Sequence, residues 1–186
     1  EKCVTDSGLQ VSHEVVSPVA SAEAVLDKRQ KELGVAVVDI GAGTTSLAVY
    51  EEGKLIHLAV IPIGAGHITN DLAIALKAPI EIAEKVKLKY GYATPELVRG
   101  DVNTVISLSK VSEEETGECT RGFVAEVIEA RLREIFEYVN EELHSIEKDR
   151  MLPAGIVLTG GGASTRGIVD LGKAVLELPV KVGVPV

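Results

Sequence analysis

The stretch Asp39-Ile40-Gly41-Ala42-Gly43-Thr44-Thr45 combines the residue types that a phosphate-binding turn needs. Gly41 and Gly43 allow backbone conformations and close approaches that a Cβ atom would block. Backbone N–H groups in such a turn, with the hydroxyl groups of Thr44 and Thr45, form a concave set of donors for a phosphate. Asp39 ends the preceding apolar run, where its carboxylate is placed to hold Mg²⁺ directly or through water.

A plain hairpin turn is the alternative explanation for these glycines, because short glycine motifs also arise by chance. The dinucleotide-binding fingerprint does not fit. Ser46 stands where its third glycine belongs, and the chain continues as a predicted strand through Tyr50 rather than as a helix. This stretch alone leaves phosphate binding and a structural turn as equal alternatives.

A second glycine loop strengthens the phosphate hypothesis. Gly160, Gly161, Gly162 and Ala163 follow the apolar run at 155–159, which predicts a buried strand. A helix expected at 165–178 would direct its N-terminal N–H groups into this loop. Two glycine loops, each directly after a buried strand, are stronger evidence for a ligand site than one.

The elements expected around these loops are those of an α/β domain. Apolar runs predict an antiparallel meander of strands at 35–40, 45–50 and 55–63, and further strands at 9–16, 155–159 and 180–182. Helical periodicity predicts helices at 20–26, from Thr69 or Asn70 onward, at 79–90, at 123–146 and at 165–178, with a charged turn at 27–32. Residues 92–119, with a short strand near 105–108 and the acidic run 113–115, have the character of a small inserted subdomain.

Two charged residues on the predicted helix 79–90 could serve a site or only the surface. Glu84 and Lys87 lie three positions apart and therefore share a helix face. Taken alone, this spacing favours an ordinary solvated salt bridge. The predicted helix 123–146 carries a regular apolar stripe, which leaves its charged face available to a partner.

Composition excludes several classes of function. The 186 residues carry a net charge of −9, which argues against a nucleic-acid-binding surface. The two cysteines, Cys3 and Cys119, are far apart, so a disulfide framework or a cysteine metal site is not expected and a reducing cytosol is. No apolar run is long enough for a transmembrane helix, and no signal peptide is visible. Because the chain opens on Glu1 rather than Met, we expect it to be a piece of a longer protein.

The two loops, the meander and the helix carrying Glu84 and Lys87 resemble the second lobe of the actin, Hsp70 and sugar-kinase superfamily. Within it, the flanking stretches resemble the bacterial FtsA cell-division family nearly end to end. The stretches that carry this resemblance are 18–26, 67–73, 83–87 with Tyr90-Gly91, 129–135 and 155–162. The resemblance implies an actin-like (ribonuclease H-like) α/β fold, in which a mixed sheet flanked by helices carries a small inserted α+β subdomain.

The resemblance also implies a division of the chain and a cofactor. Residues 1–34 would be a remnant of the first lobe and a linker, 35–77 with 151–186 the nucleotide-binding subdomain, and 78–150 an outer subdomain. The family binds ATP with Mg²⁺ between two lobes. By resemblance, 39–45 is the second phosphate loop, 159–163 the adenosine loop, and Glu84 and Lys87 reach the ribose hydroxyl groups.

Family members are adaptors that recruit the tubulin-like protein FtsZ through its C-terminal tail, form filaments with their own kind and join other divisome proteins. They act in the bacterial cytoplasm at the division site, on the inner membrane, which they reach through a C-terminal amphipathic helix that has no counterpart here. Arg131, Arg133 and Tyr138 on the long helix are the expected contacts with an acidic FtsZ tail.

The family's first phosphate loop has no matching stretch here, so we expect weak or no ATP binding by this chain, no assigned catalytic residue and at most weak ATPase activity in a longer protein. Two alternatives stay open from the residues alone. One is an enzyme of the same fold, either a chaperone-type ATPase or a sugar kinase. The other is a pilus-assembly relative similar to PilM.

Overall fold

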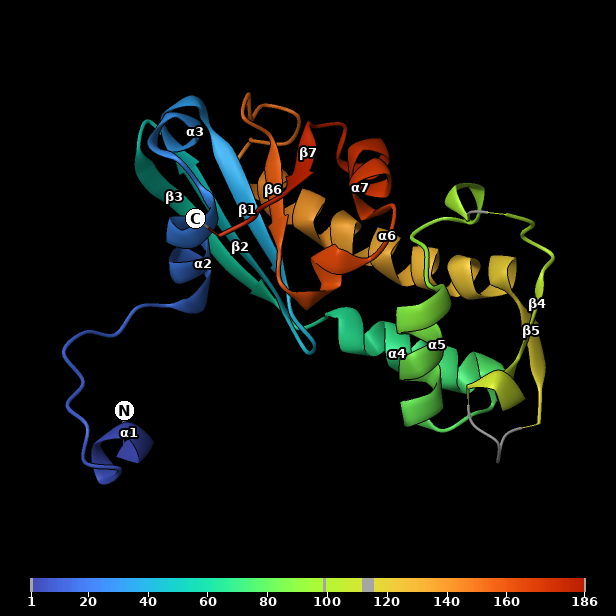
Figure 1. Cartoon of the computed structure of the whole chain (residues 1–186). Coiled ribbons are helices and arrows are strands. Elements are labelled where there is room, and N and C mark those ends of the chain that lie inside the picture. The colour runs from blue at the N-terminus through green and yellow to red at the C-terminus, as the bar shows by residue number, and fades with distance from the viewer. Residues whose placement is uncertain (1, 99, 112–115, 186) are drawn as a thin grey trace.

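The computed structural model describes residues 2–98, 100–111 and 116–185. Its centre is a five-stranded mixed sheet in the order β3-β2-β1-β6-β7 (Figure 1). The first three strands, β1 (Val35–Ile40), β2 (Thr45–Glu51) and β3 (Lys54–Ile61), form the predicted antiparallel meander. β6 (Ile156–Thr159) and β7 (Val180–Val182) add to it in parallel. The predicted strands at 155–159 and 180–182 are therefore confirmed.

The central strand β1 is covered on both faces, as its valine-rich sequence predicts. Ala36, Val38 and Ile40 face the main core, which α4 (Ala65–Leu76), α5 (Ile80–Tyr90), α6 (Arg121–Ser145) and α7 (Ile168–Leu176) complete. Val35 and Val37 face a smaller cluster on the opposite side, where α2 (Ser17–Val25) packs. The sheet is thus a middle layer with helices on both sides (Figure 1).

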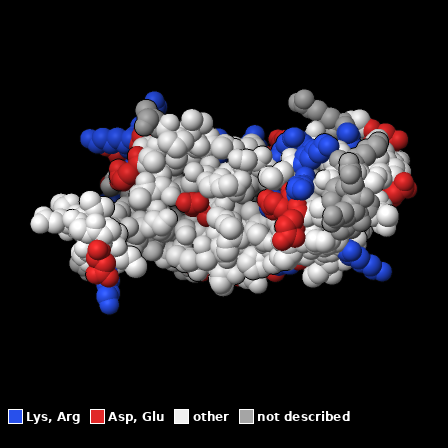
Figure 2. All heavy atoms as spheres, turned by 60° about the horizontal axis from the view of Figure 1, so that its bottom comes forward, with Lys and Arg blue, Asp and Glu red and all other residues white. Residues whose placement is uncertain are grey.

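A small subdomain lies at the N-terminal end of α6, away from the sheet (Figure 1). It holds two single-turn helices, η1 (Pro95–Leu97) and η2 (Leu108–Lys110), and a hairpin of β4 (Val105–Ser107) with β5 (Glu118–Thr120). The sequence predicted β4 but not its partner β5, a three-residue strand with little apolar character. The predicted acidic run at 113–115 lies outside the described residues. Charged side chains lie mainly toward the two ends of the molecule, this one included, whereas the middle of the same view is mostly uncharged (Figure 2).

Four expectations about local structure are wrong. Residues 9–16 form no strand, and Leu9 there is 64% exposed, because no neighbouring strand pairs with this segment in the described chain. Residues 28–33 form a helix, α3, because Asp27 and Gln30 make a capping box at its start. α4 begins at Ala65, earlier than expected, and α7 begins only at Ile168, after a single-turn helix, η3 (Gly161–Ser164).

Within the described ranges, no helix is long and apolar enough to cross a membrane. The same ranges hold no group of three or more His, Cys, Asp or Glu side chains arranged to bind a metal ion. Helix α1 (Lys2–Asp6) lies well apart from the sheet, at the end of an irregular segment (Figure 1).

Candidate functional site

The predicted phosphate loop is the tight turn between β1 and β2. The Gly41 N–H donates to the Thr44 carbonyl at 2.9 Å, which closes the turn. The start of α4 then holds it from outside, because the Ala65 and Gly66 N–H groups donate to the carbonyls of Gly41 and Ala42, both at 2.8 Å. The first residues of α4 therefore fix the shape of the loop.

The glycines flanking Ala65 explain how closely α4 can approach. A Cβ atom on Gly64 would lie 2.6 Å from the Gly41 carbonyl oxygen, and one on Gly66 would lie 2.7 Å from that of Ala42. Real Cβ atoms do not come so close to backbone atoms, so both positions require glycine. Sequence reasoning missed these two residues as part of the site, although the Gly-x-Gly spacing at 64–66 was a visible signal.

The second glycine loop lies directly beside the first, because β6 pairs in parallel with β1 and Thr159 is the partner of Asp39. Gly160 has a φ of +82°, and a Cβ atom there would lie 2.4 Å from the Asp39 Oδ1 atom. A Cβ atom on Gly162 would lie 2.4 Å from the Ile40 Cγ2 atom. Both glycines are therefore needed for the two loops to meet.

Asp39 sits at the junction of the two loops, because it is the partner of Thr159 in the pairing of β1 with β6. Its Oδ2 atom accepts a hydrogen bond from the Ser21 hydroxyl at 2.6 Å, which orients the carboxylate. One carboxylate among glycines matches the way Mg²⁺ is usually held, by one or two carboxylates together with water and phosphate oxygens. The residues present thus fit a magnesium–nucleotide complex better than a metal bound by protein alone.

The two threonines of the first loop have different environments. Thr44 is exposed at the turn, beside Gly43. Thr45 is fully buried, and its hydroxyl donates to the Ile63 carbonyl at 2.8 Å. The Thr45 hydroxyl already donates its hydrogen within the protein and so stabilises the start of β2 beside the loop. The Thr44 hydroxyl is exposed and open to a ligand. The predicted Ala163 is also buried, which places it behind the second loop.

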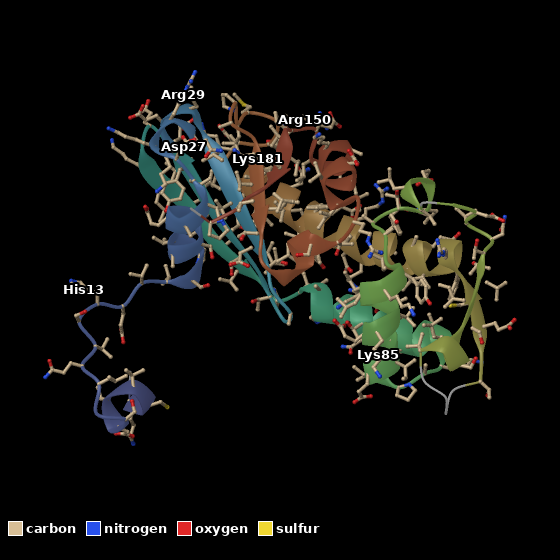
Figure 3. The ribbon with its side chains drawn as sticks, viewed as in Figure 1. His13, Asp27, Arg29, Lys85, Arg150 and Lys181 are labelled. Carbon is tan, nitrogen blue, oxygen red and sulfur yellow. The ribbon has the colours of Figure 1, made fainter. Side chains whose placement is uncertain are left out.

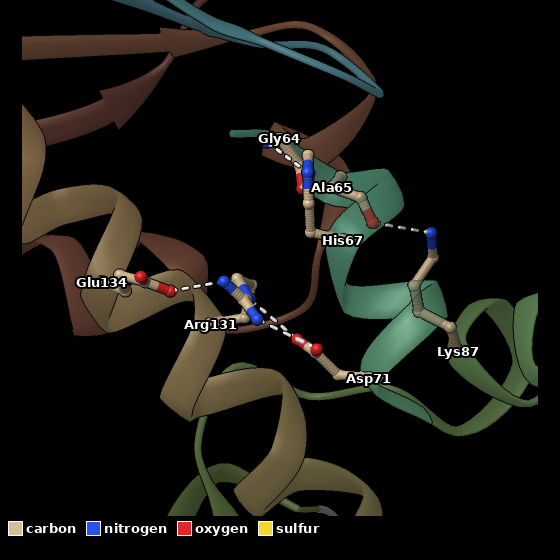
Figure 4. A network of polar contacts seen from close by, with 7 residues as sticks. All are labelled: Gly64, Ala65, His67, Asp71, Lys87, Arg131 and Glu134. Atoms are coloured by element: carbon tan, nitrogen blue, oxygen red, sulfur yellow. Dashed lines mark hydrogen bonds and ion pairs between the residues drawn. The ribbon is translucent and has the colours of Figure 1, made fainter. Parts of the chain in front are cut away.

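Glu84 and Lys87 are part of a polar cluster rather than a surface pair. The Lys87 Nζ atom lies 2.6 Å from the Glu84 carboxylate and donates to the Thr69 hydroxyl at 2.7 Å and to the Ala65 carbonyl at 3.3 Å. Figure 4 shows the bond to Ala65, which ties α5 to the start of α4. Burial acts to raise the pKa of Glu84, but hydrogen bonds from Lys87 and Thr69 and the Lys87 charge outweigh it and hold this pKa below its ordinary value.

These parts enclose a cavity of roughly 600 Å³, within the usual size range of small-ligand sites. The cavity brings together five of the predicted site residues, namely Gly41, Glu84, Lys87, Gly161 and Gly162. Gly43 lines a neighbouring hollow that shares Glu84. The lining also includes residues that the sequence did not single out: Ala42, Ala65, Gly66, Leu88, Gly91, Ser164, Thr165 and Arg166. Backbone-rich walls with one ammonium group and one carboxylate suit a ligand that carries both phosphate and hydroxyl groups.

The three residues predicted to contact a partner, Arg131, Arg133 and Tyr138, do not all lie on one face of α6. Arg131 donates to the Asp71 carboxylate at 2.7 and 2.9 Å and to Glu134 at 2.5 Å, and so bridges α4 and α6 (Figure 4). These hydrogen bonds and the nearby carboxylate charges raise the pKa of Arg131 above its ordinary value, against a smaller opposing effect of burial. Tyr138 lies seven residues along on the same helix face and is 41% exposed, whereas Arg133 faces another way and pairs with Glu129 at 2.7 Å.

Comparison with known proteins identifies the family. The model of the family described as cell division protein FtsA matches residues 36–186. The chain belongs to the FtsA family of cell-division proteins. It is 42% identical over 185 residues to the FtsA of Pseudomonas aeruginosa, covering 100% of this chain and 44% of that protein. It is 38% identical to the FtsA of Bacillus subtilis, covering 99% of this chain and 41% of that protein.

The chain thus spans less than half the length of these FtsA relatives. Solved structures show the same fold at lower identity. MreB5 of Spiroplasma citri bound to ADP matches with a TM-score of 0.71 at 22% identity, over 98% of this chain and 60% of that one. EutJ of Carboxydothermus hydrogenoformans matches with a TM-score of 0.69 at 24% identity, over 99% and 55%. The expected actin-like α/β fold is therefore confirmed.

Proposed function

We propose that this chain forms one wall of an adenine-nucleotide site in an actin-like cell-division protein. The observation that carries the proposal is the cavity in which the 39–45 turn, the 159–163 loop and the Glu84–Lys87 pair meet. MreB5 of Spiroplasma citri, which shares the fold, was solved with ADP and with AMPPNP. The site geometry is compatible with such ligands because its glycines leave room for a phosphate against the backbone.

The position of each residue in the cavity determines which part of the nucleotide it would contact. Backbone N–H groups of the 39–45 turn and the exposed Thr44 hydroxyl would contact the phosphates, and the Asp39 carboxylate would hold Mg²⁺ through water. Lys87, held by Glu84 and Thr69, faces the ribose hydroxyl groups together with Glu84. The Gly161–Ser164 turn supports the base and ribose. No residue is assigned to catalyse hydrolysis, because one wall of the cavity does not position an attacking water.

We propose further that 35–77 with 151–186 form the nucleotide-binding subdomain and 78–150 the outer one. α6 links them, because its second half packs in the same core as the sheet, with Val139 and Leu143 fully buried. This continuity gives the outer subdomain a rigid connection to the nucleotide loops.

Titration with a fluorescent ADP analogue tests the nucleotide site. We expect weak, saturable binding with a dissociation constant of about 1 mM, because a single wall supplies only part of the contacts. Lys87→Ala should weaken it about fivefold or more, the loss of one charged contact. Lys85→Ala is the matched control, since Lys85 is exposed on the same helix and lies outside the cavity lining (Figure 3). Equal affinities for the two variants would contradict the proposal.

A second proposed function is recruitment of FtsZ through its C-terminal tail, at the division site on the cytoplasmic face of the membrane. Membership of the FtsA family supports it, and so do Arg131 and Tyr138, which share one face of α6. Arg131 would exchange its bond to Glu134 for a tail carboxylate while keeping Asp71. Self-assembly into filaments, other divisome partners and membrane attachment belong to this proposal for the longer family proteins.

Fluorescence anisotropy with a labelled FtsZ tail peptide tests recruitment. We expect a dissociation constant in the micromolar range, on the order of −8 kcal/mol. Tyr138→Ala and Arg131→Glu should both weaken binding, whereas Arg133→Glu should not, because Arg133 lies off this face. Circular dichroism must show that each variant is folded. Absence of binding by the folded wild-type chain would remove this function from it.

A further inference from the structure

Strand β3 is the open edge of the sheet. In the described part of the chain it pairs with β2 on one side and with no strand on the other. An edge strand presents unpaired backbone N–H and C=O groups, which can accept an added strand. Natural proteins usually protect such an edge with charges, a proline or a bulge within it.

A β-bulge at Ile56 interrupts the pairing of β3 with β2, but the strand beyond it, 57–61, holds no Lys, Asp, Glu or Pro. Leu58 and Val60 alternate along this part and are 38% and 58% exposed. Leu58 is the cross-strand partner of Ala48, which packs in the small cluster on the α2 side of the sheet. Leu58 and Val60 therefore continue that apolar face out to the sheet edge.

The opposite face of the same edge is acidic. There the His57 Nε2 atom lies 2.8 Å from the Glu142 carboxylate of α6, so α6 runs directly behind β3. A groove of about 320 Å³ follows, lined by Val60 and Pro62 from the strand side and by Tyr138, Glu141 and Glu142 from α6. We call it the β3 groove. The exposed Glu141 carboxylate beside the Tyr138 ring, next to Glu142 that already bonds His57, attracts Lys or Arg side chains through charge and cation–π contacts.

We propose that β3 and the β3 groove bind an extended peptide segment of another protein as an added strand, with alternating apolar and basic side chains. Because side chains of a strand point alternately to the two faces, the apolar ones would cover Leu58 and Val60. The basic ones would enter the β3 groove beside Tyr138 and Glu141. This partner is opposite in charge to an acidic tail at Arg131, so the proposal goes beyond FtsZ recruitment, although Tyr138 borders both surfaces. It is independent of nucleotide binding.

A second copy of the chain is a poorer occupant of the same edge. Pairing two β3 strands would bring Glu141 and Glu142 of both copies to the same strand edge, where like charges repel. The net charge of −9 adds to this repulsion. A basic partner gains from the same charges.

Titration with designed peptides of about ten residues, close to a long strand, tests the proposal. The probe is a fluorescein-labelled peptide that alternates Val or Thr with Lys. Two control peptides replace every Lys by Glu, or keep the composition without alternation. We expect the alternating basic peptide to bind at least about fivefold more tightly than either control. On binding, the backbone amides of 54–61 should gain protection from hydrogen exchange.

A pair of matched charge-reversal variants tests whether the peptide binds at the β3 groove. Glu141→Lys should weaken binding at least about fivefold, a change typical of reversing one partly exposed charge contact. Glu126→Lys makes the same charge change on an exposed position of α6 about four helical turns away and should have no effect beyond the general charge. Equal effects of the two variants, no preference for the alternating peptide, or self-association through β3 in sedimentation would each overturn the proposal.

Discussion

Replacing Arg131 by alanine should destabilise the chain far more than replacing Arg133, although both are arginines on α6. The Arg131 guanidinium bridges two helices, with two N–H groups on Asp71 at 2.7 and 2.9 Å and a third on Glu134 at 2.5 Å. The Arg133 guanidinium makes a single pair with Glu129 within its own helix. The variants therefore separate an interhelical tie from a local surface pair.

The expected magnitudes follow from exposure. The side chains of Arg131 and Asp71 are 25% and 28% exposed, so their pair lies between the surface and buried cases. Breaking a buried pair costs about 3–5 kcal/mol and an exposed one under about 1 kcal/mol, which places Arg131→Ala at about 2 kcal/mol. The Arg133 pair has an exposed arginine and should cost about 0.3–0.5 kcal/mol, the usual value for such a pair along a helix.

Urea unfolding monitored by circular dichroism measures both losses. For a chain of this size, a loss of 2 kcal/mol corresponds to a fall in melting temperature of about 4–8 °C. The double variant with Asp71→Asn should cost about as much as either single change in that pair, because both remove one interaction. If Arg131→Ala costs no more than Arg133→Ala, the bridge between α4 and α6 does not stabilise the fold and this reasoning is refuted.

Three further changes test the site. Gly162→Val should abolish nucleotide binding and lower stability by about 1–3 kcal/mol, because its Cβ atom would overlap Ile40; calorimetry and the nucleotide titration measure the two effects. Thr45→Val should cost about 1–2 kcal/mol in urea unfolding, since it removes the buried hydrogen bond to Ile63. The Glu84 pKa lies below its ordinary value of 4.5, so this group's stabilisation is fully present above pH 4.5 and is lost as pH falls through the lowered pKa; acid unfolding of Glu84→Gln should lack that portion.

Two of these changes have a stability control in the 39–45 turn. Gly43→Ala is the control for Gly162→Val, because nothing lies within 4 Å of a Cβ atom at Gly43 and the fold should tolerate it. Thr44→Val is the control for Thr45→Val, since Thr44 is exposed and should change stability by less than about 0.5 kcal/mol. Equal destabilisation within either pair, or an unchanged acid transition in Glu84→Gln, would contradict the assigned contacts.

The sequence predicted the sheet because its signals were local. The valine-rich β1 and the apolar strands after it carry their burial pattern in consecutive residues, and Pro79 and Gly91 frame α5. Where the outcome depended on tertiary partners, prediction failed. Residues 9–16 have strand-like side chains but no neighbouring strand, and α4 begins early because Gly64 and Gly66 fit against the 39–45 turn.

In the candidate site too, features with a local sequence signal were predicted and features that depend on tertiary contacts were not. The glycine loops were visible as motifs, and the parallel pairing of β1 with β6 brings them together. Arg166 and Leu88 carry no motif, and only the path of the chain places them in the cavity. The roles of Arg131 and Thr45 could not be predicted, because each depends on a partner distant in sequence, Asp71 and Ile63.

Mapping the amide signals of the ¹⁵N-labelled chain during titration with magnesium and ADP tests the nucleotide site most directly. We expect the shifts to concentrate in the turn at 39–45, at Ala65 and Gly66, along 160–166 and near Lys87. Gly162→Val should remove these shifts, while Lys85→Ala, outside the cavity lining, should preserve them. Shifts that gather elsewhere, or none up to concentrations well above about 1 mM, would contradict the claim that this cavity is one wall of a nucleotide site.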